Sequence, residues 1–222
     1  MARPGLMIFD CDGVLVDSEH IDARIRSECF QAAGFLVTTE ELLANSGTSR
    51  AGLVEMIDRR FGRPIAEGFM EEARAKILSV FTEELRAIDG VGQLLDSLPM
   101  PICVASNSHH DRIRHSLEVT DLWRFFDPHV FSAMMVTRAK PAPDLFLFAA
   151  ERLNVAPGDC LVVEDSVNGI TAARAAGMDV IGFCGGSHCG PGHADSLLSA
   201  GCSRVFARMS EVREFLHSLD EC

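Results

Sequence analysis

Short apolar runs that alternate with helical patterns constrain the fold of this chain most strongly. The runs have the length of buried strands, and we interpret them as strands at residues 6–10, 102–106, 129–132, 161–165 and 180–184, with a weaker one at 204–207. Helical periodicity lies between the later runs, at residues 91–98, 109–119, 143–154 and 167–176. This alternation predicts an α/β fold, a doubly wound parallel sheet with a Rossmann-like core and helices on both faces.

Residues 17–88 differ from the rest of the chain because they contain no convincing strand. Their helical periodicity is broken at Gly34, Gly47, Gly62 and Pro64. The segment falls between the first strand and the remainder of the sheet. We therefore predict a small helical domain of residues 17–88, inserted into an α/β core formed by residues 1–16 and 89–222.

The charge balance excludes some classes of partner. Among the 222 residues, 32 acidic side chains face 20 basic ones, which gives a formal net charge of −12. A protein that binds nucleic acid without sequence specificity, or that binds an anionic membrane surface, requires a basic face. Neither nucleic acid nor a membrane is therefore expected as a partner. The chain has no apolar run near ~18 residues and no recognisable signal peptide. Eight scattered cysteines without a CxxC pair favour a reduced, cytoplasmic protein. The sequence leaves the oligomeric state open, and a monomer is our expectation.

Two aspartates, Asp10 and Asp12, follow the first predicted strand within IFDCDGVLVDS, residues 8–18. Residues two apart in extended backbone point to the same side, so both carboxylates are expected at one edge of the sheet. Their mutual repulsion favours a divalent cation with oxygen ligands. One carboxylate can then attack an electrophile while the other transfers a proton. The alternative interpretation is a solvated acidic turn.

Three further polar segments also occur where predicted strands or loops approach that edge, which is where ligands bind in open parallel sheets. Ser106 and Asn107 precede a predicted helix. They can bind a phosphate at the N-terminus of that helix, or they can simply cap it. Lys140 lies between prolines in RAKPAPD and is suited to neutralise a phosphoryl group, unless it is an ordinary surface lysine. Glu164 and Asp165 come at the end of an apolar strand. They are interpreted either as metal ligands or as acids that cap the next helix.

These residues together resemble the haloacid dehalogenase superfamily of phosphohydrolases. The resemblance rests on DCDGVLVDS at residues 10–18, Ser106, Lys140 and the pair Glu164–Asp165, and it covers the whole chain. The pattern is similar to the β-phosphoglucomutase-like branch, which has a helical cap domain inserted after the first strand. Within that branch, residues 85–95 and the FCGG segment at 183–186 look most like the 6-phosphogluconate phosphatase group.

The resemblance implies a mechanism as well as a fold. Asp10 would be the nucleophile that forms a phospho-aspartate, and Asp12 would protonate the leaving alcohol and then activate water. Ser106, Asn107 and Lys140 would bind the phosphoryl group. The implied cofactor is Mg²⁺, with ligands at Asp10, the backbone carbonyl of Asp12, Asp165 and, directly or through water, Glu164.

The inserted domain is expected to determine which substrate binds. Gly47, Ser49 and Arg50 occupy the place of the family's specificity loop, and Arg50 is suited to grip a distal carboxylate or phosphate. His20 is a further candidate at the substrate. The mutases of the branch carry a cap histidine where this chain has Asp22, which argues against a mutase. We expect a phosphatase of small sugar-type phosphomonoesters, a phosphorylated sugar acid such as 6-phosphogluconate first and a hexose phosphate second. A phosphosugar mutase and a non-catalytic phosphate-binding module are the alternatives.

One cluster of soft metal ligands stays outside this scheme. Cys184, His188, Cys189 and His193 fall within CGGSHCGPGH. Their proximity suggests zinc, but their spacing matches no standard zinc finger and the glycines favour a loop. The sequence leaves open whether these residues bind a metal or whether His188 and His193 are loop residues close to the active-site edge.

Overall fold

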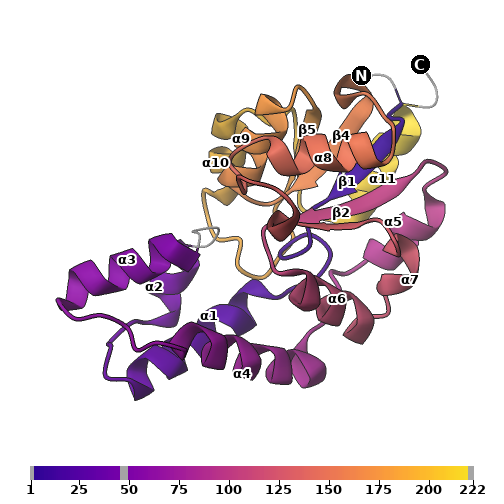
Figure 1. Cartoon of the computed structure of the whole chain (residues 1–222). Coiled ribbons are helices and arrows are strands. Elements are labelled where there is room, and N and C mark those ends of the chain that lie inside the picture. The colour runs from indigo at the N-terminus through magenta and orange to yellow at the C-terminus, as the bar shows by residue number, and fades with distance from the viewer. Residues whose placement is uncertain (1–2, 46–49, 220–222) are drawn as a thin grey trace. The chain divides into compact units, whose positions relative to one another are not determined.

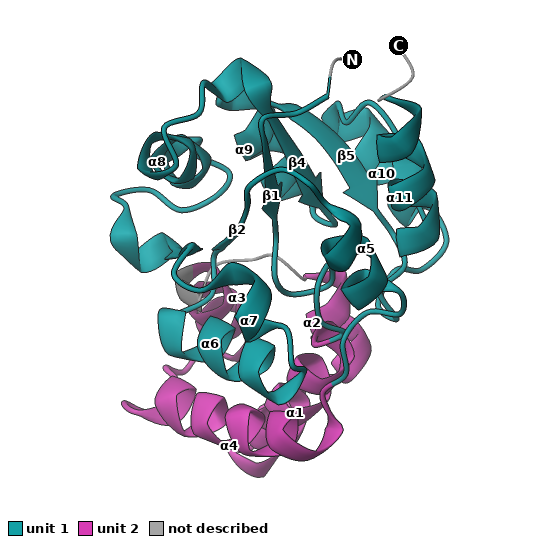
Figure 2. Ribbon diagram, turned by 90° about the vertical axis from the view of Figure 1, so that its right-hand side faces the viewer, with its two compact units in different colours: residues 1–17, 86–222 teal, residues 18–85 magenta. Residues whose placement is uncertain are grey.

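The computed structural model of the chain describes residues 3–45 and 50–219. It divides into two compact units, residues 1–17 with 86–222 and residues 18–85, which Figure 2 shows in different colours. The first unit contains the sheet and the second contains only helices among its described residues. Each unit has its own buried apolar cluster.

The larger unit is built on one six-stranded sheet (Figure 1), whose strand order is β3-β2-β1-β4-β5-β6. Every adjacent pair is parallel. The fold prediction of a doubly wound parallel sheet is therefore confirmed, including the weak last strand. The strands are β1 (Leu6–Phe9), β2 (Ile102–Ser106), β3 (Val130–Ser132), β4 (Cys160–Glu164), β5 (Asp179–Phe183) and β6 (Val205–Phe206).

Helices cover both faces of this sheet. Successive apolar side chains of the buried central strand point to opposite faces, so each face needs a layer of helices to cover it. Leu6 and Ile8 of β1 belong to the cluster that includes α8, α9 and α10. Phe9 points the other way and meets Phe126 of α7 edge-on, with the ring centroids 6.1 Å apart. The helices of this unit are α5 (Val91–Ser97), α6 (His110–Val119), α7 (Trp123–Phe126), α8 (Asp144–Arg152), α9 (Val167–Ala175), α10 (His193–Ala200) and α11 (Met209–Ser218), with short 3-10 turns η1 (Ala133–Met135) and η2 (Pro157–Asp159).

The sequence analysis did not predict three of these helices, α7, α10 and α11. The last of them carried a usable signal, because α11 buries Met209, Val212 and Leu216 at the three- and four-residue spacing of an amphipathic helix. In contrast, α10 follows a glycine-rich segment and buries only Leu197. Its position depends on tertiary packing against α9 and β5.

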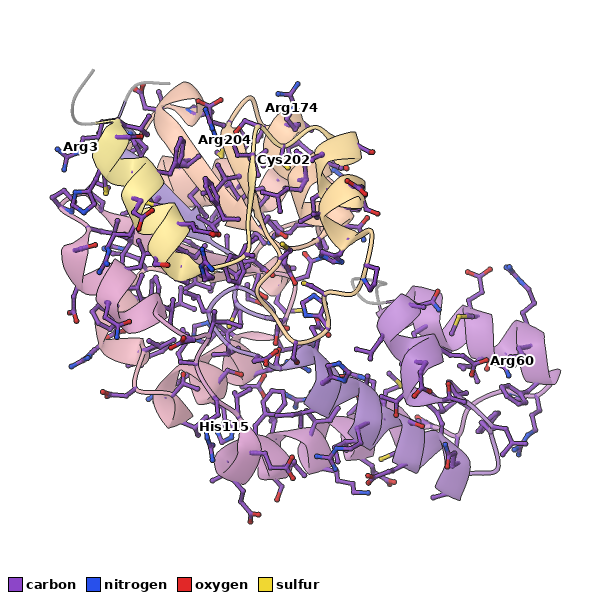
Figure 3. The ribbon with its side chains drawn as sticks, turned by 180° about the vertical axis from the view of Figure 1, so that it is seen from behind. Arg3, Arg60, His115, Arg174, Cys202 and Arg204 are labelled. Carbon is purple, nitrogen blue, oxygen red and sulfur yellow. The ribbon has the colours of Figure 1, made fainter. Side chains whose placement is uncertain are left out.

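The smaller unit packs four helices around an aromatic cluster. These helices are α1 (Glu19–Ala32), α2 (Thr39–Ala44), α3 (Arg50–Phe61) and α4 (Phe69–Glu84). The Phe30 ring lies 4.9 Å from Phe69 and 6.2 Å from Phe35 between centroids. Arg60, labelled in Figure 3, connects α3 to α2 through a 2.7 Å ion pair with Glu41. Even α4, the longest helix in the described residues, lacks the length and apolar character to cross a membrane, and so do the others.

Candidate active site

A buried lysine between two carboxylates forms the centre of the site. Lys140 Nζ lies 2.9 Å from Asp10 Oδ1 and 2.6 Å from Glu164 Oε1. Asp10 directly follows β1, and Glu164 ends the neighbouring strand β4. The parallel pairing of β1 and β4 therefore brings together two acids that are far apart in sequence. The Lys140 and Glu164 side chains are only 3% and 0% exposed, so the interaction is shielded from water.

Asn107 holds the Lys140 backbone in place. Its Oδ1 accepts a hydrogen bond from Lys140 N at 3.0 Å, and its Nδ2 donates to Lys140 O at 3.1 Å. Both ends of the amide are thus engaged with the lysine segment. These two hydrogen bonds position Lys140, and the predicted contact of Asn107 with a phosphoryl group stays a prediction. Phe146 of α8 supports the same lysine, with Nζ 4.7 Å from the ring centroid.

Glu164 is likewise fully engaged. Its Oε2 accepts hydrogen bonds from Asp165 N at 3.1 Å, from Ser166 N at 3.1 Å and from Ser166 Oγ at 2.9 Å. Its other oxygen faces Lys140. These contacts make Glu164 the residue that orients the lysine and closes the turn into α9. A direct bond to a metal ion would require Glu164 to give up part of this set.

The three acids at this edge are close enough to hold one cation. Asp10, Glu164 and Asp165 each offer a carboxylate oxygen, and these oxygens lie within 4.8 Å of one another. Burial raises the pKa of Asp10 well above its usual range, Lys140 opposes that effect, and the charges of Glu164 and Asp165 add to it. Burial alone would lower the pKa of Lys140, but Asp10 and Glu164 raise it instead. A hard divalent cation with oxygen ligands fits this excess of negative charge.

Asp165 is held from the loop that follows β5. His188 Nε2 lies 3.0 Å from Asp165 Oδ2, and His193 Nε2 lies 2.7 Å from the Asp165 backbone oxygen. Gly13 leaves room for this arrangement, because its φ is +79° and a Cβ there would overlap Asp165 Oδ2. The sequence analysis singled out both histidines but did not connect them with Asp165. The contacts of His188 and His193 with Asp165 depend on the conformation of a loop, and the sequence of that loop has no periodic pattern that would predict it.

Asp12 contacts a second pair of polar residues. Its Oδ2 accepts a 2.6 Å hydrogen bond from Ser108 Oγ, and its Oδ1 lies 2.8 Å from Arg112 Nη2. Arg112 is on α6 and is buried. The sequence did not point to Ser108 or Arg112. For Arg112 a usable signal existed, because it adjoins Ile113 on the buried side of an amphipathic helix. Ser106 is buried beneath them, and its Oγ accepts from Ser108 N at 3.1 Å.

The candidate specificity residues belong to the smaller unit. Gly47 and Ser49 lie outside the described residues. Arg50 begins α3, and only its backbone is described. His20 lies exposed in the first turn of α1. Asp22 is buried and forms a paired contact with Arg26 one turn later in the same helix.

The fold and the site define a class of protein, an α/β protein with acids and a buried lysine gathered at the carboxyl ends of parallel strands. The haloacid dehalogenase-like hydrolase family matches residues 5–177. A 6-phosphogluconate phosphatase of Escherichia coli is 35% identical over 190 residues, 85% of this chain and 86% of that protein. A haloacid dehalogenase-like protein of unknown function from Agrobacterium tumefaciens is 37% identical, with a TM-score of 0.85 over 97% of this chain and 99% of its own.

A candidate β-phosphoglucomutase from Thermotoga maritima is also similar, at 26% identity and a TM-score of 0.76 over 98% of this chain and 99% of its own. This chain belongs to the haloacid dehalogenase-like hydrolase family. The predicted resemblance to its β-phosphoglucomutase-like branch is confirmed, and so is the predicted enzyme class, a phosphatase of that family acting on phosphoric monoesters.

Proposed function

We propose that this chain hydrolyses a small sugar-type phosphomonoester with the help of Mg²⁺ and through a phospho-aspartate at Asp10. The observation that carries the proposal is the buried contact of Lys140 with both Asp10 and Glu164, beside the carboxylate of Asp165. A lysine held in this way cannot be an ordinary surface residue. It places a fixed positive charge beside the carboxylate that attacks phosphorus.

The first chemical step uses Asp10 as the nucleophile. A carboxylate oxygen of Asp10 bonds to phosphorus, and the bond between phosphorus and the sugar oxygen breaks. The Lys140 ammonium neutralises negative charge that develops on the phosphoryl oxygens. Ser106 ends β2, and its hydroxyl and the following backbone are the proposed further contacts of that group. Water then attacks phosphorus and releases Asp10 as a carboxylate together with inorganic phosphate.

Asp12 is the proposed proton carrier of both steps. As an acid it gives a proton to the departing sugar oxygen, and as a base it takes one from the attacking water. In the structure its carboxylate contacts Ser108 and Arg112. Asp12 must therefore exchange part of these contacts for the sugar oxygen when substrate binds. Arg112 acts as a positioning residue that holds the carboxylate until then.

Asp10 and Asp165, with the Asp12 backbone carbonyl, are the proposed ligands of Mg²⁺. Glu164 borders the same cluster. When bound, the ion would neutralise phosphoryl charge and favour the ionised form of the nucleophile. His188 and His193 keep Asp165 in position through its other oxygen atoms.

Among substrates, we infer that 6-phosphogluconate is the first to test. The support is the E. coli relative of that name, which matches this chain over most of both lengths. A sugar acid carries a second anionic group, and an arginine binds such a group with two parallel hydrogen bonds. Arg50 is the proposed partner of that distal carboxylate, with Gly47, Ser49 and His20 as neighbours to test by mutation.

Phosphate release from a panel of phosphomonoesters tests this proposal. The panel contains 6-phosphogluconate, hexose and pentose phosphates, phosphoglycolate, a nucleotide and an aryl phosphate, each assayed with Mg²⁺ and with chelator. We expect metal-dependent release, with the sugar acid preferred and no release by the Asp10→Asn variant. Full activity of Asp10→Asn would contradict the phospho-aspartate step. Equal rates with chelator would contradict the Mg²⁺ requirement.

The same panel addresses the two alternatives. A phosphosugar mutase would convert a bisphosphate-primed sugar phosphate into a new isomer and release little phosphate. Asp22 argues against a mutase reaction, because the mutases of the branch carry a histidine at this position. The Asp22 carboxylate is also paired with Arg26 within α1. A non-catalytic module would give neither product nor isomer, although it would still bind phosphate.

A further inference from the structure

The loop between β5 and α10 brings three soft metal ligands together. His188, Cys189 and His193 each offer one ligand atom, and these atoms all lie within 4.8 Å of one another. Cys189 Sγ is 3.4 Å from His188 Nε2 and 4.0 Å from His188 Nδ1. A tetrahedral zinc ion separates a thiolate sulfur from an imidazole nitrogen by about 3.5 Å. The distance from Sγ to His188 Nδ1, the nitrogen that does not face Asp165, therefore exceeds what one ion requires by about 0.5 Å. Cys184 is not a member of this group.

One nitrogen of each imidazole, Nε2, already faces an oxygen of Asp165. His193 Nε2 faces the Asp165 backbone oxygen, which can only accept a hydrogen bond, so Nε2 carries the hydrogen and Nδ1 has the lone pair in the neutral ring. His188 Nε2 faces the Asp165 carboxylate at 3.0 Å, which favours the same tautomer. Histidines that bind metals nearly always donate their second N–H to a carboxylate or a backbone carbonyl. Both histidines here have that second partner.

The loop backbone holds the group in this arrangement. Cys189 N donates to Gly186 O at 3.0 Å, and His193 N donates to Gly190 O at 3.2 Å. Gly186 lies directly under the His188 ring, where a Cβ would come within 2.8 Å of the ring atoms. The His188 and His193 rings meet edge to face, with their centroids 5.4 Å apart. All three residues remain partly open to solvent.

We propose that His188, Cys189 and His193 form a binding site for one soft or borderline divalent transition-metal ion, of which Zn²⁺ is the model, separate from the carboxylate cluster of Asp10, Glu164 and Asp165. Two nitrogens and one sulfur suit Zn²⁺, whereas Mg²⁺ prefers oxygen. Three protein ligands leave the fourth position to water or to a bound ligand. Because both imidazoles donate to Asp165, an ion in this site would also stiffen the support of that acid.

Metal titration of the metal-free full-length chain tests this site, in excess Mg²⁺ and near neutral pH. Zn²⁺ affinity is measured by competition with a chromogenic chelator. Co²⁺ is the spectroscopic probe, because a cobalt–thiolate bond gives an ultraviolet charge-transfer band. We expect one ion per chain and a thiolate band in the natural protein. Cys189→Ser and His193→Ala should each weaken Zn²⁺ binding at least about tenfold, and Cys189→Ser should remove the band.

Two control variants separate this site from other thiols and from the carboxylate cluster. Cys29→Ser changes another partly buried cysteine, in α1, and should leave Zn²⁺ affinity and the band unchanged. Asp10→Asn removes an oxygen ligand of the carboxylate cluster and should also leave both unchanged. Melting curves of the metal-free variants show whether each one folds, and His193→Ala provides the test if Cys189→Ser does not.

Three results would overturn the proposal. One is a natural protein that binds no Zn²⁺ in the presence of Mg²⁺. Another is equal Zn²⁺ affinity in the natural protein and in a folded Cys189→Ser variant. The third is a loss of Zn²⁺ binding in Asp10→Asn, which would place the ion among the carboxylates.

Discussion

Replacing Lys140 by methionine should destabilise the fold in a way that depends on pH. The change keeps a long apolar side chain but removes the ammonium that contacts Asp10 at 2.9 Å and Glu164 at 2.6 Å. The two acid side chains are 13% and 0% exposed, so water cannot replace the lost partner fully. Each hydrogen bond to a charged group contributes about 1.5–3 kcal/mol. Breaking a buried ion pair from one side costs about 3–5 kcal/mol, which agrees with two such bonds.

The pH dependence follows from the carboxyl groups left behind. Without the ammonium, the pKa of Asp10 rises further above that of the unfolded chain, because burial raises it and Lys140 no longer opposes that effect. The folded variant then binds more protons than its unfolded form, so its free energy of unfolding increases as the pH falls. Relative to the natural protein, we expect a loss of about 3–5 kcal/mol near about pH 8. Proton uptake by one group offsets roughly 1.4 kcal/mol per pH unit, so the loss should be clearly smaller near about pH 5.

Urea unfolding and thermal melting with chelator present measure this effect. At about 2–4 °C per kcal/mol for a chain of this size, the melting temperature should fall by roughly 10 °C near the higher pH. Lys76→Met is the matched control, because Lys76 is the other lysine of the chain and its 3.3 Å contact with Glu28 is half exposed. It should change stability by at most about 1 kcal/mol. Equal losses in both variants, or a Lys140→Met loss that stays the same at both pH values, would refute the reasoning.

Four further outcomes concern activity. Asp10→Asn should lower kcat by roughly a thousandfold or more, because an amide is a poor nucleophile, with an unchanged circular dichroism spectrum; measurable turnover near the natural rate would contradict this. Because burial raises the pKa of Asp10 and a protonated carboxyl cannot attack, kcat/KM should fall as the pH decreases, and added Mg²⁺ should move this decline to lower pH. Arg112→Met should slow the first step, formation of the phospho-enzyme in a single turnover, about a hundredfold for a sugar phosphate but much less for an aryl phosphate, whose leaving group needs no proton; equal losses in this step would remove Arg112 from the positioning of Asp12. Arg50→Ala should raise KM for the preferred sugar acid more than for an aryl phosphate, and a parallel change in both would exclude a specificity role.

The strands were predictable because their signal is local. Parallel strands covered on both faces must be apolar throughout, so LMIF, ICVAS and CLVVE stand out from their surroundings. The acids and the serine that follow these strands were predictable for the same reason, since the carboxyl ends of parallel strands meet at one edge. Lys140 was identified from its motif, and the structure brings it to that edge from the segment between η1 and α8.

The contacts between these residues were not predictable in the same way. Strand alternation predicts Asp12 at the same edge as Asp10, but the contacts of its carboxylate with Ser108 and Arg112 come from the segment after β2, which a local pattern does not reveal. Likewise, the sequence predicts Asn107 near a phosphate, but its two hydrogen bonds to the Lys140 backbone follow only from the approach of the lysine segment to the end of β2.

The amino-acid sequence by itself determined the parallel α/β sheet, the family and the residue types at the ends of the strands. The tertiary structure decided which atom each of them contacts. Lys140 lies 130 positions from Asp10, and Arg112 lies 100 positions from Asp12. The pairing of His188 with Asp165 also depends on a loop that carries no periodic pattern. Local sequence patterns predict the backbone conformation of one segment. A buried polar side chain, in contrast, points toward the hydrogen-bond partner that replaces water, and here that partner comes from elsewhere in the chain.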